Sequence, residues 1–320
     1  MGKTLLPYEM LDLASSAADA RRLDRMESIY HRGQALIWNG KELLDALVQK
    51  HGGVRVPKEK HAAMKSVLGS ILWGELAAWK ISAQLADRIE PLGAKMAATS
   101  QAHDEARHFY VMHDYLQLAV GEVPRRIHPA SERLLEDVLA TDDLACKILG
   151  MQLQVETTAL TIFQHAREVS ICPVLTELLL YVEKDEARHI GLGMQYLPIL
   201  IRAMGPLARA RFTAFALKVT AHMIAAHHAM QHDLRALGLD PRRILLLGKS
   251  KQAIVFEELW ETAPGSKSAV GDVASLGIQA IANALFPEPG QESMASRGRA
   301  FVRALRSEGV PKVPTTIAPE

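Results

Sequence analysis

The pentapeptide DEARH occupies residues 104–108 and recurs unchanged at residues 185–189, an offset of 81 residues. Each copy contains a Glu-x-x-His motif. On a helix, positions i and i+3 are neighbours on one face, with Cβ atoms roughly 5–6 Å apart. A carboxylate and an imidazole presented from one face form a bidentate metal clip. Two such clips in one chain predict a two-metal centre.

The rest of the sequence predicts an all-α protein. Strand signals are nearly absent, and Ala, Leu, Met, Glu, Lys and Arg fill long stretches with helical periodicity. Prolines and glycines separate these stretches, because the residue before a proline disfavours the helical conformation. Helices are expected at about 8–33, 40–51, 58–90, 91–120, 130–140, 142–170, 173–204, 206–236, 241–262, 270–285 and 293–307.

Each motif helix follows a long helix that carries a glutamate in an apolar setting. Glu75 and Glu156 both lie 30 residues before the glutamate of the next motif. At the rise of an α-helix, Glu75 is roughly 22 Å before the break at Pro91 and Glu105 is roughly 21 Å after it. An antiparallel hairpin therefore brings these glutamates level, and the second half repeats the count. Six candidate metal ligands thus meet at one height: Glu75, Glu105, His108, Glu156, Glu186 and His189.

Four buried carboxylates need counter-charge. Without it, their burial would be strongly destabilising. Two divalent cations supply the charge, and a carboxylate and imidazole ligand set suits iron or manganese. One Glu from each of two helices, with Glu-x-x-His from each of two others, is the pattern of ferritin-like di-iron carboxylate bundles.

On these residues, the chain resembles the ferritin-like di-iron carboxylate superfamily over about residues 58–204. It is most similar to the oxygen-activating branch, which includes ribonucleotide reductase small subunits, soluble di-iron monooxygenases, acyl-carrier-protein desaturases and arylamine N-oxygenases. The resemblance implies a ferritin-like four-helix bundle with a buried di-metal centre. We expect a single domain over residues 1–290, with accessory helices at 8–51 and 206–285 and a tail at 291–320.

The aspartates of the repeat, Asp104 and Asp185, are expected to accept the second N–H of a metal-bound histidine. The resemblance implies a crossed pairing, in which each aspartate serves the histidine of the other copy. Arg107 and Arg188 would then neutralise the aspartates. The other interpretation is an ordinary Asp–Arg pair on the helix surface. Gln101, one turn before the first motif glutamate, is expected to orient a ligand, a water or the substrate.

Positions one turn from the ligands are expected to line a pocket, and most of them are small or apolar. An apolar wall suits oxygen activation beside an apolar organic group, because it shields reactive intermediates from water. Plain core packing is the other interpretation of these residues. The positions are Ala78, Gln101, Met112, Leu153, Leu160, Val182 and Gly193.

Two positions depart from known branches of the superfamily. Met112 stands where similar ribonucleotide reductase small subunits carry a radical tyrosine, which disfavours the standard radical role. Leu160 stands where many soluble monooxygenases carry a threonine. Tyr115 and Tyr196 share the 81-residue offset, and core packing is a simpler interpretation for them than electron relay.

The helix expected at 206–236 contains four histidines. His228 and His232 are spaced i,i+4, which suits a metal, but no carboxylate pattern accompanies them. Capping of the pocket or contact with a partner is the other interpretation. The set is His222, His227, His228 and His232.

Composition limits the classes of partner. The net charge of +1 gives no electrostatic case for nucleic acid or an anionic membrane. The two cysteines form no Cys-x-x-Cys pair, and no uncharged apolar run reaches the length of a membrane span. No secretory signal is recognised, so a cytoplasmic protein is expected. No flavin, NAD or ferredoxin motif is present, so electrons are expected from an external reductase, ferredoxin or small reductant.

The leading hypothesis is an oxidoreductase with two iron ions, or a Mn/Fe pair, that uses dioxygen as co-substrate. It would oxidise a small, largely apolar organic substrate by hydroxylation, N-oxygenation, desaturation or oxidative cleavage. The alternatives are a ferroxidase or iron-handling protein, a radical-generating subunit, and a helical interaction protein without enzymatic activity. A homodimer is expected from the resemblance and from the extra apolar helices outside the bundle.

Overall fold

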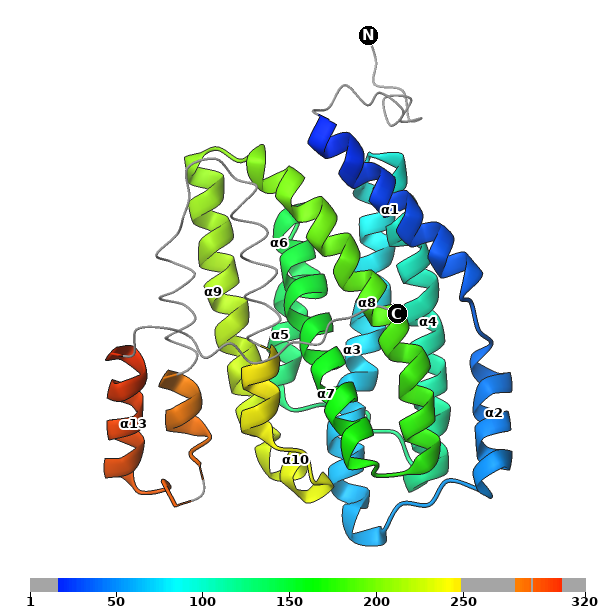
Figure 1. The fold of residues 1–320 in the computed structure, drawn as a ribbon, viewed down its shortest axis with the longest axis vertical. Coiled ribbons are helices and arrows are strands. Elements are labelled where there is room, and N and C mark those ends of the chain that lie inside the picture. The colour runs from blue at the N-terminus through cyan, green and yellow to red at the C-terminus, as the bar shows by residue number, and fades with distance from the viewer. Residues whose placement is uncertain (1–16, 249–279, 289, 307–320) are drawn as a thin grey trace.

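The structure is a computed structural model that describes residues 17–248, 280–288 and 290–306. Over these residues it consists of helices joined by short connections, and it contains no strand (Figure 1). The expected all-α fold with a ferritin-like bundle is confirmed. The division into a domain at 1–290 and a tail at 291–320 stays a prediction.

Two antiparallel hairpins form the core of the bundle (Figure 1). The first consists of α3 (His61–Arg88) and α4 (Leu92–Val120), which pack along their lengths. The second consists of a composite rod and α8 (Pro173–Arg202), and it contacts the first through α4 and α8. Three consecutive segments make up the composite rod: α6 (Leu144–Ile148), η3 (Leu149–Val155) and α7 (Glu156–Val169).

The turns of both hairpins follow from local sequence. Pro91 is the N-cap of α4 in an extended conformation, so the chain reverses where the proline predicts. In the second hairpin, Ser170 adopts a left-handed conformation with φ of 52°, which ends α7. Pro173 then begins α8, where its missing N–H costs no helical hydrogen bond. Residues Lys58–Lys60 form a separate 3₁₀ turn before α3, within the helix expected at 58–90.

The expectation of one regular helix at 142–170 is wrong in its type. Residues Leu149–Val155 form a π-helix immediately before Glu156. A π-helical turn is wider than an α-helical one and often occurs at functional sites. Small residues allow the rod to pack closely there, since a Cβ atom on Gly193 would lie 2.8 Å from the Cβ atom of Gln152.

Accessory helices cover the bundle. α1 (Ala17–Ala35) packs across α4 and α8, and α2 (Gly40–His51) lies against the same two helices. On the other side of the bundle, α9 (Pro206–Ala229) contacts α5 (Pro129–Ala140) and the π-helical segment. α10 (Gln231–Leu237) packs against α3. The accessory helices therefore enclose the bundle on two sides.

The helix expected at 206–236 is not continuous. It ends at Ala229, and Met230 has φ of −87° and ψ of 0°, which lets the chain turn before α10. The helix expected near 293–307 is present as α13 (Met294–Arg306). Other expected helices are described only in part, because 8–16 and 249–279 lie outside the described residues.

The apolar core has two main parts. One contains residues from the C-terminal half of α3 and the N-terminal half of α4, such as Leu85 and Ala98. The other contains residues from the opposite halves, such as Leu68 and Tyr115. The candidate ligands lie between these parts along every helix of the bundle. The polar cluster is therefore surrounded by apolar packing above and below.

Pro198 lies inside α8, where it removes one backbone hydrogen bond. The acceptor that is freed is the carbonyl of Met194, four residues earlier. Arg22 from α1 donates to this carbonyl at 3.3 Å and also to the side chain of Gln195 at 3.3 Å. The accessory helix thus satisfies a polar group that the proline leaves unpaired.

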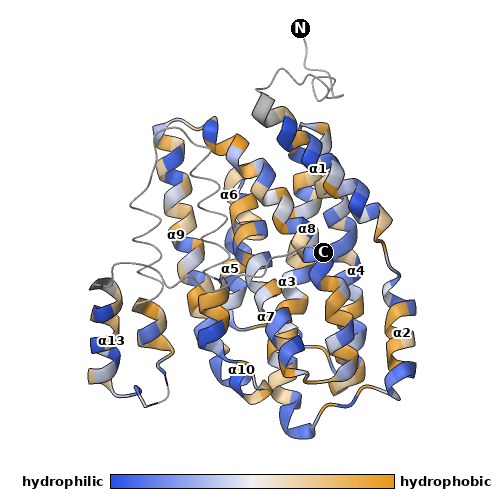
Figure 2. Ribbon diagram, viewed as in Figure 1, coloured by the Kyte–Doolittle hydropathy of each residue, from blue (hydrophilic) through white to orange (hydrophobic). Residues whose placement is uncertain are grey.

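Hydrophobic and hydrophilic residues alternate around the helices, as Figure 2 shows. Within the described parts of the chain, no helix combines the length and the apolar character that crossing a membrane requires. The alternation of hydrophobic and hydrophilic residues is typical of helices that bury one side against a core.

Candidate metal centre

The six candidate ligands from the sequence meet in the middle of the bundle, and all are buried. The Nδ1 atom of His108 lies 3.4 Å from Glu75 and 3.3 Å from Glu186. Glu156 lies 3.9 Å from the Nδ1 atom of His189. The two hairpins therefore bring the candidate ligands to one height, as the helix arithmetic predicts.

Two carboxylates lie between the two histidines. Glu105 places its Oε2 atom 3.5 Å from His108 and its Oε1 atom 3.0 Å from His189. Glu186 places Oε1 3.3 Å from His108 and Oε2 3.3 Å from His189. Each of these carboxylates therefore offers one oxygen to each side, whereas Glu75 and Glu156 each lie at one side only.

The ligand atoms form two overlapping groups that could each hold a metal ion. In each group the atoms lie within 4.8 Å of one another, and Glu105 and Glu186 belong to both. The groups are Glu75, Glu105, His108 and Glu186 on one side, and Glu105, Glu156, Glu186 and His189 on the other.

The hydrogen bonds of the cluster are incomplete in a way that fits bound cations. Glu105 Oε2, Glu186 Oε1 and His108 Nδ1 are buried, and within the described part of the chain they have no hydrogen-bond partner. Buried polar atoms of proteins normally have partners. All three atoms point into the cluster, and carboxylate and imidazole atoms of this kind are ligands for iron or manganese. The donor set therefore fits two divalent cations.

Without cations, bound protons compensate the negative charge of the four carboxylates in the cluster. Burial and the neighbouring carboxylates raise the pKa of Glu75 and of Glu156 well above the usual range. Burial opposes the charged form of His108 and of His189, but the surrounding carboxylates outweigh it and raise the pKa of both histidines. For Glu105, the two histidines outweigh burial and hold its pKa well below the usual range.

The two aspartates of the repeat support the histidines from outside, in the crossed arrangement that the resemblance implies. The Nε2 atom of His108 lies 3.0 Å from Asp185, and that of His189 lies 3.4 Å from Asp104. Each histidine therefore directs Nδ1 into the cluster and Nε2 toward an aspartate. A carboxylate partner of this kind fixes the orientation of a ligand histidine.

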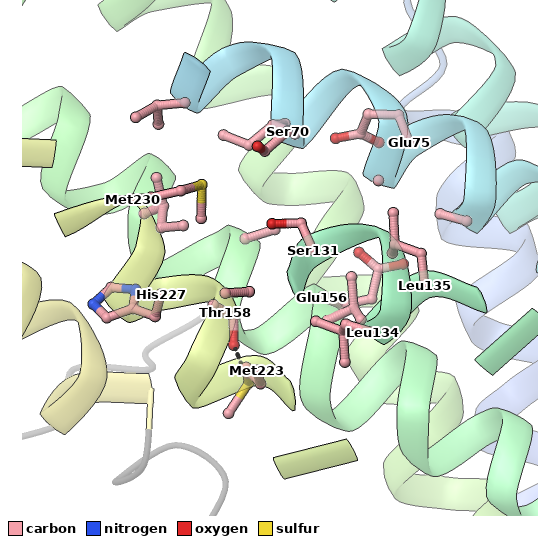
Figure 3. Close-up of a pocket in the computed structure, with 18 of the residues that line it drawn as sticks. Ser70, Glu75, Ser131, Leu134, Leu135, Glu156, Thr158, Met223, His227 and Met230 are labelled. Atoms are coloured by element: carbon pink, nitrogen blue, oxygen red, sulfur yellow. Dashed lines mark hydrogen bonds between the residues drawn. The ribbon is translucent and has the colours of Figure 1, made fainter. Parts of the chain in front are cut away.

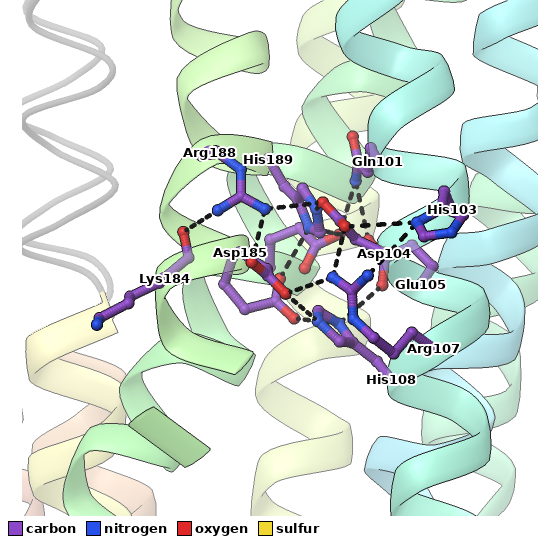
Figure 4. A network of polar contacts seen from close by, with 12 residues as sticks. Gln101, His103, Asp104, Glu105, Arg107, His108, Lys184, Asp185, Arg188 and His189 are labelled. Carbon is purple, nitrogen blue, oxygen red and sulfur yellow. Dashed lines mark hydrogen bonds and ion pairs between the residues drawn. The ribbon is translucent and has the colours of Figure 1, made fainter. Parts of the chain in front are cut away.

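Arg107 and Arg188 neutralise both aspartates (Figure 4). Arg107 donates to Asp104 at 2.6 Å and to Asp185 at 2.8 Å. Arg188 donates to Asp185 at 2.6 Å and to Asp104 at 3.0 Å. Both guanidinium groups are buried, so these are internal ion pairs and the interpretation as surface pairs is wrong. Burial opposes ionisation of Asp185, but His108 and Arg188 outweigh it and lower its pKa.

Sequence reasoning missed Trp38, which lies between α1 and α2. Its indole N–H donates to Asp185 at 2.8 Å. The guanidinium of Arg107 lies 4.5 Å from the centre of the indole ring, and the ring stacks on His108 with a centroid distance of 6.1 Å. No motif marks this residue, because it lies 66 residues before the first repeat.

Two glutamine side chains extend the network on the other side. Gln101 donates to Glu105 at 3.1 Å and to Glu156 at 3.0 Å, so it contacts two candidate ligands, and its role in orienting them stays a prediction. Gln152 donates to the amide oxygen of Gln101 at 3.1 Å. Gln152 was not expected at the site, because its position is set by the π-helical segment.

A cavity of about 100 Å³ reaches the cluster at Glu75 and Glu156 (Figure 3). It lies between α3, α5, the composite rod and α9. Of the seven positions expected to line a pocket, Ala78 lines this cavity. The other six do not, and Met112, Leu153 and Val182 pack in the apolar core. The cavity is lined mainly by aliphatic residues, including Val67, Ile71, Leu134, Leu135, Val155, Ile162 and Met223.

The four histidines of α9 and α10 do not gather into one site. His222 pairs with Asp137 at 2.8 Å, and His227 is buried beside the cavity. The ring of His228 contacts Phe286. Among the described residues, the groups suited to a metal ion contain none of these histidines. The interpretation as a pocket cap is supported for His227 alone.

The two offset tyrosines lie in the apolar core. Tyr115 is fully buried, and its hydroxyl has no hydrogen-bond partner in the described segments. Burial raises the pKa of Tyr115 well above the usual range and the pKa of Tyr196 to about 12. Both are therefore neutral at physiological pH and contribute to packing.

Comparison with known proteins gives similarity of structure alone. No protein-family model and no curated protein sequence matches the chain. An R2-like ligand-binding oxidase with an aerobically reconstituted Mn/Fe cofactor matches with a TM-score of 0.59 and 16% identity, over 81% of this chain and 98% of the other. A mutant of such an oxidase with an anaerobically reconstituted Mn/Fe cofactor matches with a TM-score of 0.54 and 17% identity, over 79% and 94%.

A protein with aldehyde deformylating oxidase activity from Synechococcus is also similar. It has a TM-score of 0.55 and 19% identity, and the match covers 69% of this chain and 97% of that chain. At these identities the similarity shows the fold alone, a helical bundle shared with these oxidases.

Proposed function

We propose that the protein is an oxidoreductase, a di-metal oxidase or oxygenase. The observation that carries the proposal is the pair of overlapping ligand groups, in which Glu105 and Glu186 each offer one oxygen to each side. The structural neighbours with Mn/Fe cofactors support a pair of iron ions or a Mn/Fe pair. The proposed ligands are Glu75, Glu105, His108, Glu156, Glu186 and His189.

A metal pair in this site would supply the electrons that reduce dioxygen, which is the co-substrate. The residues around it hold the ligands in place. Asp104 and Asp185 accept the Nε2 protons of the histidines, which leaves each Nδ1 atom free for a metal. Apolar packing above and below the cluster excludes water from the centre.

The cavity supports an organic substrate. It brings a small, largely apolar molecule beside Glu75 and Glu156, which are the only carboxylates among the described residues that line it. A path for iron ions would be expected to carry more oxygen ligands, since hard cations prefer them. The cavity therefore favours an oxidase or oxygenase over an iron-storage protein. An external reductant would renew the electrons of the metal pair.

Iron loading tests the proposal. Metal-free protein is loaded with Fe(II) under anaerobic conditions, washed and analysed, and we expect about two iron ions per chain. Addition of dioxygen should then change the absorbance as the iron is oxidised. Glu105→Ala should lose more than half of the bound iron, because this residue serves both sides. Mixed loading with Mn(II) and Fe(II) distinguishes the two metal pairs.

Glu177→Gln is the matched control, since Glu177 lies on α8 but is partly exposed and paired with Lys50 at 2.7 Å. This variant should bind iron as the wild type does. Circular dichroism shows whether each variant keeps its helices. Equal iron content in the wild type and in Glu105→Ala would contradict the ligand assignment, and no absorbance change with dioxygen would contradict the activity.

A further inference from the structure

Most polar groups of the cavity already have a partner inside the protein. The hydroxyls of Ser70 and Thr158 each donate to the carbonyl four residues earlier in their own helix, at 3.0 and 2.8 Å. His227 is hydrogen-bonded through Nε2 to the carbonyl of Pro241 at 2.6 Å. These groups are therefore engaged before any ligand binds.

Ser131 differs from these residues. It is the third residue of α5, its side chain lines the cavity, and it is 7% exposed. Its hydroxyl is buried and has no hydrogen-bond partner among the residues that the structure describes. In the view of Figure 3 the Ser131 hydroxyl lies between Glu156 and Met230, among the other side chains of the cavity. A buried polar group without a partner destabilises the folded protein, so this hydroxyl is available for a ligand.

The other lining residues define the chemistry of that ligand. The described residues that line the cavity include no lysine or arginine, so no fixed positive charge would balance an anionic group near Ser131. Burial lowers the pKa of His227, which keeps it neutral. The volume is about 100 Å³, which is less than the roughly 150 Å³ of an apolar cavity that accommodates benzene. The space therefore limits the apolar group to about one ring at most.

We propose that Ser131 is a substrate-binding residue, whose hydroxyl bonds a neutral polar group, such as a carbonyl or hydroxyl, on a ring-sized and otherwise apolar molecule. This inference rests on the proposed function, in which the cavity holds the molecule that is oxidised. The hydrogen bond fixes which part of the molecule lies beside Glu75 and Glu156.

Binding of three probes to the full-length protein tests the proposal. Acetophenone carries a carbonyl, ethylbenzene has the same carbon skeleton without it, and benzoate carries a charge. Calorimetry should show that the wild type prefers acetophenone to benzoate. Ser131→Ala should weaken acetophenone binding roughly three- to tenfold, the value of one ordinary hydrogen bond, and change ethylbenzene binding less than about twofold.

Ser70→Ala is the matched control, because it removes a hydroxyl of the same cavity that is already bonded within its helix. It should leave the preference between acetophenone and ethylbenzene unchanged. The melting temperature gives a second measurement. Ser131→Ala should melt at the same temperature as the wild type or higher, since it removes an unsatisfied buried group.

Several results would overturn the inference. These are an equal loss for acetophenone and ethylbenzene in Ser131→Ala, binding of benzoate as tight as that of acetophenone, a lower melting temperature for Ser131→Ala, and no binding of any probe to the wild type. Iron content and dioxygen uptake are measured on the same samples. Failure of the metal loading with an intact probe preference would overturn the proposed function and leave the Ser131 site standing.

Discussion

The two copies of the repeat have the same sequence but different surroundings. His108 lies 3.0 Å from its aspartate, whereas His189 lies 3.4 Å from its own. Asp185 also accepts the indole N–H of Trp38 at 2.8 Å, and the position offset by 81 residues from Trp38 is Ala119, which has no such donor. The comparison teaches that the repeat duplicates ligands, while segments outside it make the two sides unequal.

The glutamines add a second difference. Gln101 donates to Glu105 and Glu156, and Gln152 supports it from the π-helical segment. At the same offset, their counterparts are Val182 and Ile71, which cannot donate. On the side of His108, the aspartate therefore accepts an extra hydrogen bond from an indole. On the side of His189, two glutamine amides are hydrogen-bonded in series to the carboxylates. We expect the two metals to bind with different affinities.

Removing the charge of each aspartate would give the largest difference between the sides. Loss of a partner of a ligand histidine costs about ten- to a hundredfold in metal affinity. Asp185→Asn should lower metal affinity about a hundredfold, and Asp104→Asn should lower it about tenfold. The loss is larger for Asp185 because it has the shorter contact to its histidine and the additional bond to Trp38.

Competition with a chelator measures Fe(II) affinity for both variants. Both replacements keep the size of the side chain and remove one partner of the same two arginines, so they control for each other. Equal losses would show that the two sides are equivalent despite their different surroundings.

The pH dependence of metal binding should be the next largest effect, and it should be shared by both sides. The raised pKa values of His108 and His189 mean that these histidines hold protons near neutral pH in the metal-free protein. A metal must displace these protons, so its affinity should rise with pH, by up to about tenfold per pH unit at each side. It should level off once pH exceeds the histidine pKa.

Calorimetric titrations at pH 6, 7 and 8 in buffers of different ionisation enthalpy count the released protons. Constant affinity over this range, with no proton release, would contradict the assigned protonation of the histidines.

Trp38→Phe should give the smallest effect, confined to the side of His108. The change removes the donor to Asp185 but keeps an aromatic ring near Arg107. A hydrogen bond to a charged group is itself worth about tenfold or more. This one acts on the metal only through Asp185 and His108, so its loss should weaken metal binding on that side by less than about tenfold. Trp73→Phe is the matched control, because its indole N–H donates to the carbonyl of Pro124 at 2.8 Å, away from the cluster.

Metal affinity of both variants is compared by chelator competition. A similar loss in both would assign the effect of Trp38 to general destabilisation. Unchanged binding in Trp38→Phe would show that its bond to Asp185 does not support His108.

Local sequence rules predicted much of this fold. Pro91 and Pro173 set the beginnings of α4 and α8 because their constraints act on adjacent residues. The break at Met230 was missed, since no glycine or proline marks it and the packing of α10 on α3 decides it. The π-helical turn before Glu156 was also missed, because apart from Gly150 and Val155 its residues are ordinary helix formers.

The candidate site also has parts that the sequence predicted and parts that it missed. Glu75 and Glu156 were found because helix rise converts sequence distance into height, and the motif spacing places Glu105 and His108 on one face. The cavity was mostly mispredicted. Most of its lining comes from α3 and the composite rod, on faces other than the expected one, and α5 and α9 complete it from beside the bundle. Expected positions such as Met112 and Val182 pack in the core instead.

The sequence by itself determined most of the helices, the six candidate ligands and their common height, because these depend on the regular rise and turn of a helix along its own axis. The tertiary structure alone decided which oxygen of Glu105 faces which histidine, how Trp38 reaches Asp185, and where Ser131 meets the cavity. Those relations join segments distant in the chain. They depend on how helices pack and rotate against one another, which the spacing within one helix does not record.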